Sequence, residues 1–205
     1  MKLLICGDSF TQCETVQPWA WYKKVADDLD AEIINLSIVG ASNFNIWHQI
    51  AYAKQHMEFD AVLISLTRPN RVEKVLVDNY DVADNVVDYT HFADTKIKSW
   101  AIHEWVQDGD YPLSTMEKFS PLPLAVSRDR IVVNDILTQL GDVPHCVINN
   151  LFTEYVDNVL DLSLSEYSDL ATGELDEPQE GHLYRSMHEK FFNEHGHLIV
   201  SKLAQ

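Results

Sequence analysis

The sequence predicts a three-layer α/β/α sandwich with a mostly parallel, doubly wound sheet. Three short segments, residues 2–6, 32–36 and 60–66, are each followed by a loop and then by a stretch with helical spacing. Strand-loop-helix units in succession are typical of a parallel sheet covered by helices on both faces. The third segment is apolar almost throughout, as expected of a strand that is buried on both sides.

Each helical stretch carries apolar residues at steps of three or four, which places them on one helix face. The residues with this spacing are Trp21, Val25 and Leu29 after the first strand, Ile46, Ile50 and Ala53 after the second, and Val132, Ile136 and Leu140 after Ser127. A fourth strand is predicted at residues 145–149. The last helix has capping-box spacing at Ser186 and Glu189, which predicts its start.

The chain of 205 residues has the size of one domain, and we predict a single domain over residues 1–205. The pattern becomes irregular between residues 71 and 123, where aromatic residues lie among acids without a clear period. We expect an inserted helical or loop region there. A long polar stretch over residues 157–181 precedes the last helix.

Composition excludes several classes of function. A formal net charge of −17 disfavours nucleic acid and anionic membrane surfaces as partners. No apolar stretch approaches the length of a membrane-spanning helix, and the first residues lack a signal-peptide pattern. Three irregularly spaced cysteines predict neither a disulfide framework nor a zinc site. We therefore expect a cytoplasmic protein with reduced thiols.

The loop after the first strand, Gly7-Asp8-Ser9-Phe10, is the first candidate for chemistry. In parallel α/β sheets, ligands bind beyond the carboxyl ends of the strands, where this loop lies. A serine there becomes a nucleophile only if a base accepts its proton. The alternative is structural, because Asp8 or Ser9 is also a preferred residue for capping a helix.

Two segments resemble the SGNH, or GDSL-like, hydrolase family, whose fold is related to that of flavodoxin. Residues 6–10, Cys-Gly-Asp-Ser-Phe, look like the nucleophile block, and residues 35–42, Asn-Leu-Ser-Ile-Val-Gly-Ala-Ser, look like the second block. The resemblance implies that Ser9 is the nucleophile. It also implies that the backbone N–H groups of Ser9 and Gly40 stabilise the oxyanion, a contribution worth roughly 3 kcal/mol for each donor.

The third block of the family departs from its usual Gly-x-Asn pattern. Thr67 stands where the glycine is expected and Pro69 where the asparagine is expected, with Asn70 one residue later. Either a bulge brings the Asn70 amide to the oxyanion or the Thr67 hydroxyl replaces it, since proline has no N–H to donate. A Pro-Asn turn without a catalytic part is the structural alternative.

The fourth block of the family supplies the base from an Asp-x-x-His sequence before the last helix. By resemblance we assign His182 as the general base, with Glu180 as the orienting carboxylate because Gln179 replaces the aspartate. A competing register starts the helix at Asn193. That register makes His188 the alternative base or leaves the site without one.

The function that these assignments predict is serine ester hydrolysis, with an O-acetylated carbohydrate or a short acyl ester as substrate. The alternative is an SGNH-fold binding or structural module without activity, because a fold does not determine a function. We predict no cofactor and no metal: the Gly-rich loop of nucleotide-binding domains is absent, and His195 and His197 point to different sides of a helix.

Overall fold

The computed structural model describes most of the chain outside the middle insertion and the segment before the last helix. The described residues are 1–11, 18–38, 41–67, 71–75, 97–101, 122–150, 159–164, 167 and 185–205. No helix in these ranges is both long enough and apolar enough to cross a membrane.

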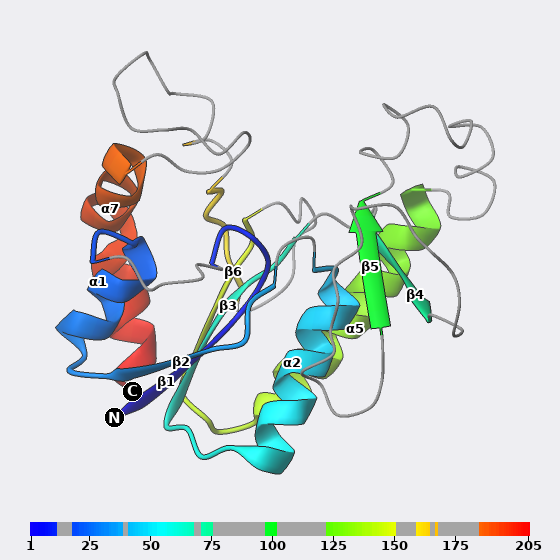
Figure 1. Ribbon diagram of the computed structural model, residues 1–205, viewed down its shortest axis with the longest axis horizontal. Coiled ribbons are helices and arrows are strands. Elements are labelled where there is room, and N and C mark those ends of the chain that lie inside the picture. The colour runs from blue at the N-terminus through cyan, green and yellow to red at the C-terminus, as the bar shows by residue number, and fades with distance from the viewer. Residues whose placement is uncertain are drawn as a thin grey trace.

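A five-stranded, all-parallel sheet forms the centre of the molecule (Figure 1). Its strands are β1 (Lys2–Cys6), β2 (Glu32–Asn35), β3 (Ala61–Ser65), β6 (His145–Ile148) and β7 (Val159–Leu160). They lie in the order β2-β1-β3-β6-β7, and the register pairs Leu4 with both Ile34 and Val62. The chain therefore winds first to one side of β1 and then to the other, which confirms the predicted doubly wound sheet.

Helices cover both faces of the sheet and complete the three layers (Figure 1). On one face α1 (Trp21–Asp28) packs against α7 (Arg185–Leu203). On the other, α2 (Asn43–His56) packs against α5 (Leu122–Leu140).

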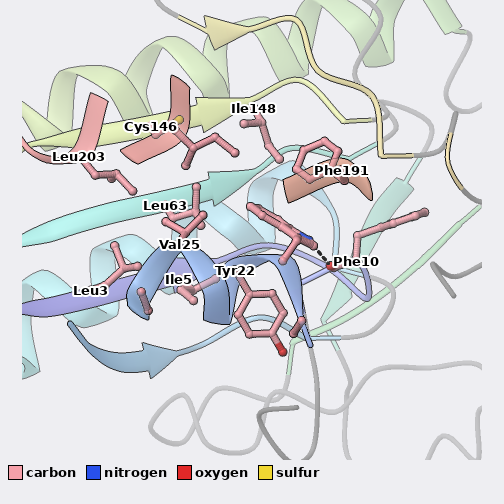
Figure 2. Close-up of a cluster of buried hydrophobic side chains, with 14 of the residues drawn as sticks. Leu3, Ile5, Phe10, Tyr22, Val25, Leu63, Cys146, Ile148, Phe191 and Leu203 are labelled. Atoms are coloured by element: carbon pink, nitrogen blue, oxygen red, sulfur yellow. Dashed lines mark hydrogen bonds between the residues drawn. The ribbon is translucent and has the colours of Figure 1, made fainter. Parts of the chain in front are cut away.

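Alternate side chains of β1 enter two separate hydrophobic cores. Leu3 and Ile5 face the layer of α1 and α7, whereas Leu4 and Cys6 face the layer of α2 and α5. Successive side chains of a strand point to opposite faces, so a strand covered on both sides must be apolar throughout. Figure 2 shows the first core, in which Phe191 of α7 and Val25 of α1 meet the sheet.

Three elements differ from the sequence-based prediction. The described part of the region 71–123 is not helical or loop-like throughout, because β4 (Arg71–Val75) and β5 (Ile97–Ala101) pair as a separate antiparallel sheet. Helix α5 starts at Leu122, before the predicted Ser127, and β7 was not predicted. A strand of two residues has too little sequence to show a period.

The bounds of helix α7 contradict one of the two registers at the C-terminus. It starts at Arg185, so Asn193 lies in its middle and the register that began the helix at Asn193 is wrong. Ser186 is the second residue of the helix, two positions after the cap position, so the predicted cap at Ser186 is wrong. The exposed Arg185 and Glu189 form an i,i+4 ion pair in that turn, with 3.8 Å between Nε and Oε1.

Candidate active site

Ser9 lies in a tight turn that follows β1 at the carboxyl edge of the sheet. Its neighbours Gly7, Asp8, Phe10 and Thr11 are buried, whereas Ser9 is partly exposed. The winding of the chain reverses between β1 and β3, which is where doubly wound sheets form a crevice for ligands. Ser9 is therefore accessible at the position where chemistry is expected.

Gly7 is held more closely than any larger residue would permit. A Cβ atom at this position would lie 2.3 Å from Thr11 Oγ1 and 3.2 Å from both the Cβ and the carbonyl oxygen of Ser65. The buried side chain of Gln49 on α2 hydrogen-bonds to both polar groups of the glycine backbone. Its Oε1 accepts from the Gly7 N–H at 2.9 Å, and its Nε2 donates to the Gly7 carbonyl at 3.1 Å. These contacts fix the chain immediately before Asp8 and Ser9.

The Asp8 carboxylate is fully buried and closes the turn around Ser9. Its Oδ1 accepts from the Phe10 N–H at 3.1 Å, and its Oδ2 accepts from the Thr67 hydroxyl at 2.8 Å. The Asp8 carbonyl also accepts from the N–H and the hydroxyl of Thr11, both at 3.1 Å. Asp8 therefore stabilises its own loop and does not cap a helix, because α1 begins only at Trp21.

Thr67 does not offer a donor to an oxyanion in this arrangement. A hydroxyl has one proton, and that of Thr67 is donated to Asp8. The Thr67 N–H donates to Asn43 Oδ1 at 2.8 Å. In this structure the Thr67 hydroxyl positions Asp8, and a role for that hydroxyl at the oxyanion stays a prediction that would require this bond to break.

His188 interacts with the start of α1, in the helix layer that α1 and α7 form. Its Nδ1 accepts from the Trp21 N–H at 3.3 Å, and its ring makes an edge contact with Trp19 at a centroid distance of 5.0 Å. The first N–H groups of a helix lack partners within it, and Ala20 provides no side-chain cap for α1. His188 therefore supplies the cap from α7.

The hydrogen bond to the Trp21 N–H also limits the use of His188 as an alternative base. A neutral imidazole has one donor and one acceptor nitrogen, so acceptance at Nδ1 places the proton on Nε2. Neither nitrogen then offers a lone pair to Ser9. The Trp21 indole, in turn, donates to the Phe10 carbonyl at 3.3 Å, so α1 supports the loop of Ser9 directly.

We expect the His188→Ala variant to lose the cap of α1 and about 1 kcal/mol in free energy of unfolding, the typical cost of removing a helix cap. Urea denaturation followed by far-UV circular dichroism measures this change. His197→Ala is the matched control, because His197 is exposed on the same helix. Equal stability of the two variants would contradict the capping role.

Four of the predicted site residues, Gly40, Asn70, Glu180 and His182, lie outside the described residues. The residues that follow Gly40 are described, and they begin helix α2, which contacts the loop of Ser9. The buried Ser42 caps α2 by accepting from the Asn45 N–H at 3.1 Å, and α2 then carries Asn43 and Gln49 inward. The roles of these four residues remain predictions.

Sequence reasoning missed the polar residues of α2 that brace the loop. Asn43 and Gln49 are fully buried, although asparagine and glutamine are usually exposed. The available signal was their position beside Ile46, Ile50 and Ala53, on the apolar face of the predicted helix. Polar residues on such a face indicate buried hydrogen bonds.

The described cysteines are unsuited to nucleophilic chemistry. Burial raises the pKa of the Cys6 thiol far above its usual range and that of Cys146 to about 12. The nucleophile of cysteine chemistry is the thiolate, which these shifts suppress at neutral pH. In the described ranges, no three His, Cys, Asp or Glu side chains converge as ligands of a metal ion.

No family model matches the chain, and no curated protein does. Among solved structures it is similar to the psychrotrophic esterase EstA from Pseudoalteromonas sp., with 14% identity, a TM-score of 0.48 and coverage of 99% of this chain and 98% of that one. A protein assigned to the lipolytic G-D-S-L family from Desulfitobacterium hafniense DCB-2 shows 10% identity, a TM-score of 0.48 and coverage of 96% and 98%. An acetylxylan esterase from Geobacillus stearothermophilus, in a mutant form, shows 12% identity, a TM-score of 0.40 and coverage of 99% and 71%.

Proposed function

We propose that this protein is a serine ester hydrolase in which Ser9 attacks the ester carbonyl. The observation that carries the proposal is the turn after β1. Its backbone is held by Gln49, Asp8 and Trp21, while residue Ser9 is partly exposed at the carboxyl edge of the sheet. A nucleophile held in one orientation avoids the entropic cost of finding its attack geometry, which lowers the barrier.

The proposed reaction is acyl transfer to water in two steps. Ser9 Oγ bonds to the carbonyl carbon while His182 accepts its proton, and His182 then protonates the departing alcohol. Water attacks the resulting acyl-serine with His182 again as base, which releases the acid and restores Ser9. Glu180 would orient the imidazole.

The oxyanion formed in each step needs donors that are already in place. We assign this role to the backbone N–H groups of Ser9 and Gly40, with the Asn70 amide as a third donor. Such preorganised donors accelerate acyl transfer because they need no rearrangement as the charge develops. The proposed substrates are small-molecule or carbohydrate esters, either O-acetyl groups on sugars or short acyl esters.

A second candidate is a binding or structural module that keeps the scaffold without turnover. The third block favours it, because Pro69 stands at the expected asparagine and the Thr67 donors are both engaged within the protein. Such a module would hold a ligand at the same edge of the sheet but would not need a reactive Ser9 hydroxyl.

Labelling with a fluorophosphonate probe distinguishes the two candidates. In the reaction, Ser9 Oγ bonds to phosphorus, fluoride leaves with the bond pair, and the serine proton passes to the base. We expect one adduct on the tryptic peptide that contains Ser9, detected by mass spectrometry, and none in Ser9→Ala. Absence of the adduct from the folded wild-type protein would reject the hydrolase in favour of the binding module.

A further inference from the structure

A buried charged pair on α5 lies at the start of a hydrogen-bond chain that leads to the loop of Ser9. The Asp129 side chain is fully buried, and its Oδ1 accepts from Arg128 Nε at 2.7 Å and lies 2.6 Å from Arg128 Nη2. The Arg128 side chain is itself 32% exposed. A buried carboxylate is costly unless it is paired and hydrogen-bonded, so this placement calls for a reason beyond helix packing.

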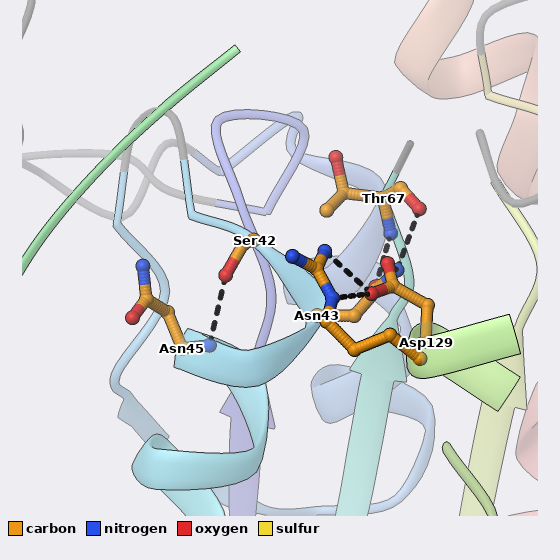
Figure 3. A network of polar contacts seen from close by, with 6 residues as sticks. Ser42, Asn43, Asn45, Thr67 and Asp129 are labelled. Carbon is orange, nitrogen blue, oxygen red and sulfur yellow. Dashed lines mark hydrogen bonds and ion pairs between the residues drawn. The ribbon is translucent and has the colours of Figure 1, made fainter. Parts of the chain in front are cut away.

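The second oxygen of Asp129 reaches across to α2 (Figure 3). Oδ2 accepts from Asn43 Nδ2 at 2.8 Å, which joins residues that are 86 positions apart in the chain. The same Asn43 nitrogen donates to the Thr67 carbonyl at 2.9 Å, and Asn43 Oδ1 accepts from the Thr67 N–H at 2.8 Å. Asn43 therefore clamps both backbone polar groups of Thr67 while Asp129 holds Asn43.

Asp129 and the Thr67 backbone require the same orientation of the Asn43 amide. A carboxylate only accepts hydrogen bonds, so the end of the amide that meets Asp129 must be its NH₂ group. In this orientation Asn43 Oδ1 faces the Thr67 N–H and accepts its hydrogen bond. In the reversed orientation, amide protons would face the Thr67 N–H and the amide oxygen would face the carboxylate.

The chain continues from Thr67 to the nucleophile loop. The Thr67 hydroxyl donates to Asp8 Oδ2, and the other oxygen of Asp8 accepts from the N–H of Phe10, the residue after Ser9. We propose that Asp129, paired with Arg128, is a positioning residue that holds the Ser9 loop in its reactive shape through Asn43, Thr67 and Asp8. Its effect on catalysis rests on the function proposed above, whereas its effect on the loop does not.

The test compares Asp129→Asn with Asp135→Asn, a matched change on the same helix. Asp135 is exposed and also binds α2, through the Trp47 indole at 2.5 Å, but it is not part of the chain that leads to Asp8. Both variants replace a carboxylate that links α5 to α2. Only the first is expected to affect the loop.

Two readouts are measured on the folded variants. Amide hydrogen exchange of residues 9–11 is expected to accelerate about tenfold in Asp129→Asn, as in a loop that opens more often. The maximal rate of fluorophosphonate labelling is expected to fall about tenfold at an unchanged half-saturating probe concentration, because misplacing a nucleophile slows the reaction without weakening binding. In Asp135→Asn both are expected to stay within about twofold of wild type.

Each outcome decides one of the two proposals. Unchanged exchange of residues 9–11 in folded Asp129→Asn would overturn the positioning role. Faster exchange in a protein whose wild-type Ser9 never reacts would support the positioning of the loop and reject the hydrolase. If Asp129→Asn does not fold, Thr67→Val removes the last link before Asp8, and unchanged exchange in that variant would overturn the role equally well.

The two variants together test whether the effect passes through Thr67. If Asp129 acts through Thr67, the double variant Asp129→Asn/Thr67→Val is expected to accelerate exchange no more than the stronger single variant does. Residues that act through one chain of contacts are non-additive in this way, whereas independent sites add. Additive effects would overturn the proposed connection.

Discussion

Replacing Ser9 with alanine is expected to reduce kcat/KM for p-nitrophenyl acetate at least about a thousandfold, because the proposed mechanism forms the acyl intermediate on Ser9 Oγ. The turn itself should persist. Its hydrogen bonds come from Gly7, Asp8, Phe10 and Thr11, so removal of the Ser9 hydroxyl leaves them in place. The loss would therefore be one of chemistry at unchanged stability, measured by absorbance of released p-nitrophenol alongside a thermal melt.

The matched control for this variant is Ser201→Ala, which removes an exposed hydroxyl from α7. We expect its turnover to equal that of wild type. Equal turnover by wild type and Ser9→Ala would assign any observed hydrolysis to another group and would favour the binding module.

Gly7→Ala is expected to cost about 3 kcal/mol in free energy of unfolding, at the upper end of what overpacking a core usually costs. The new Cβ would lie 2.3 Å from Thr11 Oγ1. That oxygen is hydrogen-bonded to the Asp8 carbonyl and lies 2.9 Å from Ser37 Oγ. On its other side the Ser65 carbonyl oxygen lies only 3.2 Å away, at the buried carboxyl end of the central strand β3. Neither neighbour moves without breaking contacts, so the strain falls on the turn that carries Ser9.

Two further variants isolate the steric cause of the Gly7→Ala effect. Gly141→Ala places a Cβ in open space at a φ of +56° and is expected to cost about 1 kcal/mol, from backbone strain alone. In the Thr11→Ala background the Gly7→Ala change should lower the free energy of unfolding by less than in wild type, because Thr11 Oγ1, the atom closest to the new Cβ, is absent. Urea denaturation measures the stability of all these variants. If the urea midpoint of Gly7→Ala equalled that of the wild-type protein, the close packing at this turn would be refuted.

The local pattern of the sequence was sufficient to predict the layers and the position of Ser9. A strand covered on both faces must be continuously apolar, and a helix on a sheet must repeat its apolar residues every three or four positions. Residues 3–6 and 61–64 meet the first condition, and Ile46, Ile50 and Ala53 meet the second. These are requirements on neighbours in the chain, so they are readable without coordinates.

Only the tertiary structure decided what surrounds Ser9. The bond between Asn43 and Asp129 joins residues 86 positions apart, and that between Trp21 and His188 joins residues 167 apart. Which polar groups meet over such separations depends on how the helices pack on the sheet, and no periodicity in the sequence records it. For the same reason the sequence did not show that His188 caps α1 or that the Thr67 hydroxyl donates to Asp8.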